Sequence, residues 1–280
     1  PEPRTADEIA TPGPGNRPLA LPYNKWHASQ WTVDQAAALL LCTAGTARRH
    51  GVPPDRWVFP LVALDANHSV SLSRRRHLHR WPAMAVLGRA AAARIGRPLA
   101  GVEVAEVYSC FPAAVRVQQR ELGLPLDGTP TVTGGMAFAG GPFNNFVYQS
   151  TAAVVPLLRD EPGRLGMVTT VCGLLTKPGL AVWSAGPDGR PPLMEDLAAE
   201  AREATPTVEV LDGYRGPATV VAATVTYDGQ TPARVVVLAE VDGDGPRCVA
   251  AAEDPALAAD VVAGDLRGAT VQVDGSTFTT

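Results

Sequence analysis

The sequence has few lysines, few aromatic residues and no long apolar run. Lysine occurs only as Lys25 and Lys177 among 280 residues, and Phe, Trp and Tyr together make up 6%. Because the formal net charge is −4, the chain has no general basic field with which to bind a nucleic acid. No apolar stretch approaches the roughly 20 residues that span a bilayer, so we expect no membrane segment. The excess of arginine over lysine suggests a bacterial protein from a GC-rich genome.

Cysteine is scarce as well, and its spacing excludes several kinds of site. The four cysteines lie far apart in the sequence, at Cys42, Cys110, Cys172 and Cys248. No C-x-x-C pair is present, which argues against the common zinc and redox motifs. We expect a reducing, cytoplasmic setting and no bound metal.

The length allows two compact units, each with its own core. Helical patterns that alternate with short β-branched strands predict a layered α/β unit over residues 32–186. Residues 206–280 alternate apolar residues with turn signals, which predicts a small β-rich barrel, OB-like in outline. Residues 1–31 are interpreted as a connecting segment exposed by truncation or processing. The proline-rich, acidic residues 187–205 are interpreted as a linker.

Local signals place the elements of the layered unit. Several expected helices begin at a proline, which is favoured at the first helical position. They end before a glycine, which is favoured just after the last helical position. The expected helices cover residues 33–50, 82–95, 112–122 and 145–159, and the expected strands cover residues 102–109, 165–171 and 180–184. The first helix is apolar on nearly every face, so we expect it to be buried between layers. Thr32 and Gln35 have the spacing of a capping box at its start.

Three loops follow predicted strands or precede helices, where α/β folds usually carry function. They read Tyr-Ser-Cys-Phe from position 108, Gly-Gly-Met-Ala-Phe-Ala-Gly-Gly-Pro from position 134, and Val-Cys-Gly from position 171. In this order they resemble loops of the thiolase superfamily, most closely the sterol-carrier-protein type and thiolase-like proteins with an additional C-terminal domain. The resemblance covers roughly residues 16–184, and more loosely the β-rich tail.

The resemblance implies a thiolase-like C-terminal half that handles acyl-CoA. In that family the loops read H-D-C-F, G-G-x-x-x-x-G-H-P and a glycine loop with Cys or Asn, and they build an oxyanion hole and an acid/base site. It also implies that the nucleophilic cysteine belongs to an N-terminal half outside this sequence. We expect that half, or another chain, to cover the apolar face of this one.

The residues matched to the motifs are the candidate catalytic residues. Tyr108 and Gly141 stand where the family has histidines, Cys110 is retained, and Cys172 lies within one residue of the third loop's position. Asn144 precedes a helix, where it would cap the helix or present an amide to a ligand. Each also has a purely structural interpretation: packed cysteines, a packed tyrosine and glycines that let backbones approach closely.

A cofactor role is expected for two further groups. Arg74, Arg75 and Arg76 have the charge to hold the phosphates of coenzyme A, unless they form a solvated basic loop. The resemblance implies that Gly134, Gly135 and Gly140 line the same substrate. A zinc site at His77 and His79 lacks partners, a P-loop lacks its lysine, and no serine lies in a G-x-S-x-G elbow.

Two functions of different class follow. The first is an acyltransferase or carbon–carbon lyase acting on coenzyme A thioesters, with an altered acid/base site. The second is a non-catalytic, degenerate thiolase module that binds acyl-CoA or a protein. The presence of a nucleophilic cysteine in a complementing half would distinguish them, although a retro-aldol lyase works without one.

Overall fold

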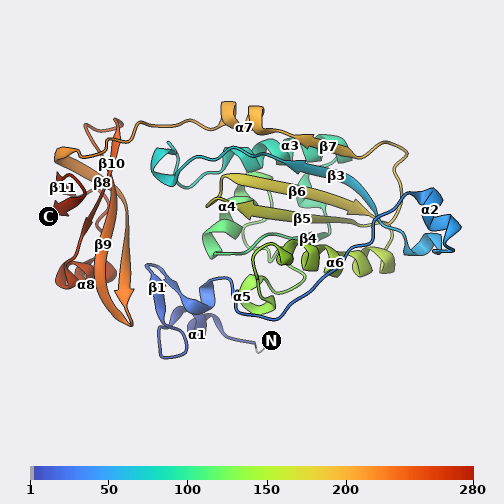
Figure 1. Ribbon diagram of the computed structural model, residues 1–280, viewed down its shortest axis with the longest axis horizontal. Coiled ribbons are helices and arrows are strands. Elements are labelled where there is room, and N and C mark those ends of the chain that lie inside the picture. The colour runs from blue at the N-terminus through green and yellow to red at the C-terminus, as the bar shows by residue number, and fades with distance from the viewer. Residues whose placement is uncertain (1–2) are drawn as a thin grey trace. The chain divides into compact units, whose positions relative to one another are not determined.

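The computed structural model describes residues 3–280, which divide into two compact units (Figure 1). The layered unit contains Ser29–Ser69 and His79–Thr205. The barrel unit contains residues 3–28, Val70–Leu78 and Pro206–Thr280. The mixed α/β unit followed by a barrel confirms the expected fold class.

A five-stranded sheet forms the centre of the layered unit, in the order β4-β5-β6-β3-β7. The strands are β3 (Phe59–Asp65), β4 (Val104–Glu106), β5 (Leu165–Cys172), β6 (Lys177–Ser184) and β7 (Leu193–Asp196). β4 runs parallel to β5 and β3 parallel to β7, whereas β6 is antiparallel to both of its neighbours. The strands expected from the sequence are therefore present, with β4 shorter than predicted.

Helices cover both faces of this sheet (Figure 1). The longer ones are α3 (Pro82–Ile95), α4 (Pro112–Leu122) and α6 (Asn145–Asp160), with shorter turns at α2 (Ala44–Arg49), η2 (Pro54–Arg56), η4 (Leu99–Gly101), α5 (Met136–Ala139) and α7 (Ala198–Ala204). Met167 of β5 belongs to the core under α3, and the next residue, Val168, packs with α6. Successive side chains of a strand point to opposite faces, so both faces of the sheet are buried.

The prediction of a long helix at residues 33–50 is wrong. Only Ala44–Arg49 is helical, and residues 34–43 have neither helix nor strand structure. Thr43, and not Thr32, caps the helix by accepting the Thr46 N–H at 3.2 Å. Leu40 is 95% exposed, so the segment is not buried between layers. An apolar run on all faces fits a buried strand as well as a buried helix, and the pattern alone does not separate the two.

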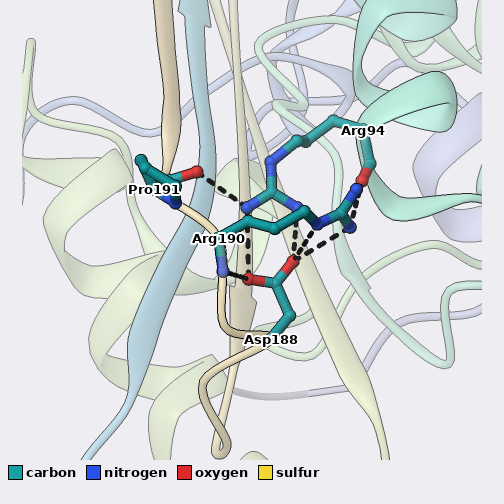
Figure 2. A network of polar contacts seen from close by, with 4 residues as sticks. All are labelled: Arg94, Asp188, Arg190 and Pro191. Atoms are coloured by element: carbon teal, nitrogen blue, oxygen red, sulfur yellow. Dashed lines mark hydrogen bonds and ion pairs between the residues drawn. The ribbon is translucent and has the colours of Figure 1, made fainter.

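Residues 187–205 carry structure where a linker was expected, since they include β7 and α7. Figure 2 shows how Arg94 at the end of α3 and Arg190 both bind the Asp188 carboxylate. Arg94 also donates to the carbonyl of Pro191 at 2.8 Å, and Arg190 donates to the carbonyl of Arg94 at 2.7 Å. The Arg94 hydrogen bond holds the pKa of Asp188 well below its ordinary value. The segment is thus fixed to the end of α3.

Five strands of the barrel unit form a closed ring, in the order β8-β9-β10-β12-β11 and back to β8. They are β8 (Arg215–Asp228), β9 (Thr231–Glu240), β10 (Arg247–Ala252), β11 (Thr270–Asp274) and β12 (Thr277–Thr279). α8 (Pro255–Ala263) lies between the third and fourth strands, and β10 pairs in parallel with β12. The expected OB-like barrel is therefore confirmed.

The barrel unit also includes segments from earlier in the chain. The interpretation of residues 1–31 as a plain connecting segment missed α1 (Ala6–Ala10), β1 (Pro18–Ala20), β2 (Tyr23–Asn24) and η1 (Lys25–His27). β1 pairs with β8 and thereby extends the barrel sheet. η3 (Leu72–Arg74) belongs to Val70–Leu78, where Arg75 forms a β-bridge with Thr207. No helix among residues 3–280 has the length and apolarity to cross a membrane.

Candidate functional site

The candidate site begins where two neighbouring parallel strands end. β4 and β5 pair in parallel, with Glu106 opposite Val168. Tyr108 and Cys110 follow β4, and Cys172 is the last residue of β5. All three residues therefore lie at the carboxyl ends of neighbouring parallel strands. The carboxyl ends of strands in open α/β sheets are the usual place for ligands.

Tyr108 presents a neutral phenol in this cluster. Its ring is half-buried and meets Phe146 edge-on, with 5.7 Å between the ring centroids. Burial raises the pKa of the hydroxyl above its ordinary value of 10.0, and the negative charges of ionised Cys110 and Cys172 raise it further. The phenol therefore stays protonated at neutral pH and can donate a hydrogen bond to a ligand oxygen.

The two thiols differ in their surroundings. Burial raises the pKa of the Cys110 thiol above 9.0, and the backbone amides of Phe111 and Cys110 offset only part of that effect. Cys172 is exposed. Cys110 is therefore an uncharged thiol at neutral pH, which is a weak nucleophile and a weak base.

Buried amides and hydroxyls fix the backbone of Tyr108. Thr169 of β5 accepts the Tyr108 N–H through Oγ1 at 2.9 Å, and Gln118 of α4 donates to the Tyr108 carbonyl at 2.8 Å. Thr169 and Gln118 are themselves joined by a 2.6 Å hydrogen bond. Sequence patterns did not reveal these two residues, because Gln118 lies 51 positions from Thr169 along the chain.

Glu106 anchors the loop that leads into the glycine-rich segment, and it too was missed. Its carboxylate accepts the backbone N–H groups of Val132 and Thr133 at 2.7 and 2.9 Å. The hydroxyls of Thr131 and Thr133 also donate to this carboxylate, at 2.9 and 3.1 Å. Burial nevertheless raises the pKa of Glu106 above its ordinary value of 4.5. An acidic residue within an otherwise apolar strand was the available signal.

The glycine-rich loop is held by contacts within the layered unit. The N–H groups of Gly134 and Gly135 donate to the hydroxyls of Thr131 and Thr133, so neither amide is free for a ligand. Gly135 has a φ of 81°, and a Cβ there would lie 2.9 Å from Ser109 Oγ. Glycine is therefore needed at 135 for backbone conformation and for close approach.

A strap, residues 29–35, connects the site loops to one another. The Ser29 N–H donates to the carbonyl of Cys110 at 3.0 Å, and the Ser29 hydroxyl donates to the carbonyl of Gly141 at 3.3 Å. Gln35 donates to the carbonyl of Ala139 at 2.8 Å and accepts from the Asn145 side chain at 2.7 Å. The strap therefore joins the Cys110 loop, the glycine-rich loop and the start of α6.

The strap also occupies the space next to Gly140 and Gly141. A Cβ at Gly140 would lie 2.7 Å from Val33 Cγ2. A Cβ at Gly141 would lie 2.2 Å from Met136 Cε and 2.3 Å from Ser29 Oγ. The histidine that the family motif carries at this position would require Met136 and Ser29 to shift. Gly141 is therefore closely packed in this chain.

The remaining candidates are Asn144 and the arginines at 74, 75 and 76. Asn144 is exposed at the start of α6, without a side-chain capping bond. Arg74, Arg75 and Arg76 belong to the barrel unit, where Arg75 is 5% exposed and Arg76 donates to the carbonyl of Asp244 at 2.9 Å. Arg74 is exposed and Arg76 is half-buried.

No group of three His, Cys, Asp or Glu residues within 3–280 is placed to hold a metal ion.

A shallow groove with a volume of about 500 Å³ lies between α3 and α7, away from the site loops. Its lining consists of Val86, Arg89, Ala90, Leu197, Glu200, Glu203 and Ala204. The candidate site is therefore defined by its side chains and not by this groove.

Comparisons with known proteins show what this chain resembles. Residues 197–276 match the family described as the thiolase-like protein type 1 additional C-terminal domain. The solved structure of a monomeric SCP2-thiolase like protein type 1 from Mycobacterium smegmatis matches with a TM-score of 0.87 and 28% identity. The chain belongs to the thiolase-like superfamily. That match covers 99% of this thiolase-like chain and 62% of the Mycobacterium smegmatis chain. No curated protein sequence matches it.

Proposed function

We propose that this thiolase-like chain binds the thioester group of an acyl-CoA, with Tyr108 as the hydrogen-bond donor to the thioester oxygen. The observation that supports the proposal is that the half-buried Tyr108 and the two cysteines lie at the carboxyl ends of two neighbouring parallel strands, where burial raises the pKa of the Tyr108 hydroxyl. A donor held in place before the ligand arrives can stabilise the negative charge that develops on a thioester oxygen. Hydrogen bonds to the Tyr108 backbone fix the position of that donor.

The same residues limit the chemistry. The Tyr108 phenol and the Cys110 thiol both have raised pKa values, so neither is a good base at neutral pH. Acyl transfer or carbon–carbon cleavage at this site therefore needs a base or nucleophile from residues outside the cluster. Without one, the chain is a non-catalytic acyl-CoA-binding module, which is the second candidate function.

The proposal includes a polypeptide partner. The Mycobacterium smegmatis relative has sequence with no counterpart in these 280 residues, because the match covers 62% of it. We propose that a thiolase-like half corresponding to that remainder acts together with this chain. The base or nucleophile would come from that half. For the phosphates of coenzyme A, the exposed Arg74 stays the proposed contact.

Two ligands that differ only at the carbonyl test the site. Butyryl-CoA carries the thioester oxygen, whereas S-butyl-CoA, a thioether, does not. We expect calorimetry to show that the chain prefers butyryl-CoA, and that Tyr108→Phe reduces this preference roughly 3- to 10-fold, the effect of one hydrogen bond. Equal affinity for both ligands, or a preference unchanged in Tyr108→Phe, would overturn the proposal. Release of free coenzyme A thiol over time would separate an enzyme from a binding module.

A further inference from the structure

Three large apolar side chains at the loops of the candidate site are open to solvent. Phe143 follows the glycine-rich loop and is 77% exposed. Leu174 comes two residues after Cys172 and is 73% exposed. Trp31 belongs to the strap and is 66% exposed. These three side chains are called the apolar rim. Single exposed apolar residues are common on protein surfaces, so exposure alone does not indicate a ligand.

The backbone under the rim is unfavourable for the residues that occupy it. Four non-glycine residues within 3–280 have a left-handed φ, and three of them lie directly after site loops: Phe143 at 46°, Leu174 at 53° and Leu175 at 64°. Bulky side chains rarely adopt this conformation, whereas glycine and asparagine adopt it more readily. The exposed Phe143 and Leu174 side chains gain little from burial that would offset the strain. Because backbone strain gathers at ligand-binding sites, it favours ligand contact over packing as the role of these two side chains.

Contacts within the candidate site fix the aromatic part of the rim. The rings of Trp31 and Phe143 meet edge-on, with 6.0 Å between their centroids. Gln30, the residue before Trp31, donates its N–H to the carbonyl of Met136 at 3.1 Å. The carbonyl of Gln30 accepts the N–H of Gly141 at 2.9 Å. The strap and the glycine-rich loop therefore hold the two rings together before any ligand binds.

The rim lies at the same end of the sheet as Tyr108. Leu174 belongs to the turn that follows Cys172, the last residue of β5. Phe143 comes just before α6, and Phe146 in the first turn of α6 meets the Tyr108 ring with 5.7 Å between the centroids. Both rim segments therefore adjoin the carboxyl ends of β4 and β5, where the candidate site is.

We infer that the apolar rim binds the hydrocarbon chain of the acyl group, so that the protein selects acyl-CoA thioesters with long acyl groups over acetyl-CoA. The inference rests on the proposed function, because a thioester oxygen at Tyr108 places the start of the acyl chain at this end of the sheet. An acetyl group carries one methyl carbon and would leave the rim exposed. A longer chain would cover the rim, and the removal of apolar surface from water would favour binding.

A protein is the less favoured occupant of the rim. A stable protein interface buries about 800 Å² on each partner. Large apolar side chains bury at most about 250 Å² each, and part of each rim side chain is already covered. The rim alone is therefore too small for a stable protein interface, whereas its size suits a hydrocarbon chain. The Mycobacterium smegmatis relative is described as monomeric, which also disfavours a second copy.

Calorimetry with four ligands separates the hydrocarbon chain from the thioester carbonyl. Butyryl-CoA and octanoyl-CoA carry the carbonyl, and the thioethers S-butyl-CoA and S-octyl-CoA lack it. We expect each eight-carbon ligand to bind roughly 10-fold more tightly than its four-carbon counterpart, because the additional methylene groups lose part of their contact with water at the rim. This gain should be the same with and without the carbonyl.

Asparagine at two rim positions removes the apolar side chains and tolerates the left-handed backbone. In the double variant Phe143→Asn with Leu174→Asn, we expect the eight-carbon gain to fall to roughly 2-fold, with the preference for the carbonyl unchanged. The matched control is Met194→Thr, because Met194 is 60% exposed on β7, at the opposite edge of the sheet from β4. The control should keep the full gain.

The chain-length gain and the carbonyl preference can be lost separately. Equal affinity for both chain lengths, with the carbonyl preference intact, would overturn the inference and leave the proposed function standing. A chain-length gain without a carbonyl preference would overturn the proposed function and keep the hydrocarbon contact. No binding of any of the four ligands would overturn both.

A folding control accompanies the double variant. Its thermal unfolding should stay unchanged or move to a higher temperature, because asparagine relieves the backbone strain. A much lower unfolding temperature would assign the rim to packing and overturn the inference. Self-association of the unmodified chain that the double variant abolishes would indicate a second copy and would also overturn it.

Discussion

Arg247 and Glu240 face each other across the antiparallel strands β10 and β9, with Nη2 of Arg247 2.8 Å from Oε1 of Glu240. Their side chains are only 4% and 14% exposed. The Arg247 guanidinium also donates to the backbone carbonyls of Arg75 and Arg76, the latter at 3.0 Å. One buried cation therefore joins the barrel strands to the earlier segment Val70–Leu78.

Removal of this cation should be costly. We expect Arg247→Met to lower the free energy of unfolding by about 3–5 kcal/mol, because Glu240 is left as a nearly buried, unpaired charge. The matched control is Arg215→Met, which breaks the exposed pair with Asp274, where the side chains are 77% and 66% exposed. The control should cost less than about 1 kcal/mol. Equal costs for both variants in urea unfolding would contradict this account.

Arg247 also offers a test of whether the barrel folds without the earlier segments of the chain. Ring closure uses β8 to β12 alone, all within Pro206–Thr280. We therefore expect a fragment of residues 206–280 to unfold cooperatively by circular dichroism. In the fragment the pair loses the cover of Val70–Leu78, so Arg247→Met should cost only about 1 kcal/mol or less. A random-coil spectrum would show that the barrel needs the earlier segments.

Sequence signals predicted the elements whose ends are encoded locally. Helices α3 and α4 begin at Pro82 and Pro112 and end before Gly96 and Gly123, as expected, because proline and left-handed glycine act on their own backbone. The segment 33–43 failed because its conformation depends on contacts with residues more than 100 positions away. No local pattern contains that information.

Only part of the candidate site could be predicted, because local motifs locate loops but not contacts between distant residues. The loop motifs located Tyr108, Cys110 and Cys172, which the structure places at one sheet edge. The motifs did not reveal Ser29, which binds a carbonyl 112 residues away. Such positioning residues carry no spacing signal, because their partners are backbone atoms that the fold brings together.

Close packing at Gly141 leads to a third prediction. Gly141→Ala should lower the free energy of unfolding by about 1–3 kcal/mol, because the new methyl group overlaps Met136 and Ser29. A methyl group at Gly163 would meet no atom within 4 Å, and the φ there is ordinary, so Gly163→Ala is the matched control. The control should change stability by no more than about 0.5 kcal/mol. A similar small change in both variants, measured by thermal unfolding, would mean that the strap moves aside easily.

Thiol reactivity gives a fourth prediction. Because burial raises the pKa of Cys110 above 9.0, its thiolate fraction at pH 8 is lower than that of an ordinary thiol. We expect iodoacetamide to alkylate Cys110 more slowly than the exposed Cys172 and Cys42, as followed by peptide mass spectrometry. The Cys110 rate should still be rising with pH above 9. Faster alkylation of Cys110 than of Cys42 at pH 7 would point instead to an activated thiol.

The last prediction concerns Glu106, whose folded pKa lies above the ordinary 4.5 because burial outweighs its hydrogen bonds. The folded state therefore binds a proton more tightly than the unfolded state does. It follows that this group's contribution to stability is fully present below pH 4.5 and is lost as the pH rises through the folded value. Glu106→Gln cannot ionise, so its stability should lack this component. We expect the free energy of unfolding of the unmodified chain, relative to Glu106→Gln, to fall between pH 4.5 and pH 8 in urea titrations. Acidic groups with lowered pKa values, such as Asp188, are common to both proteins and cancel in the comparison. A difference that is constant with pH, or that rises with pH, would show that the Thr131–Thr133 loop holds Glu106 as a stable carboxylate.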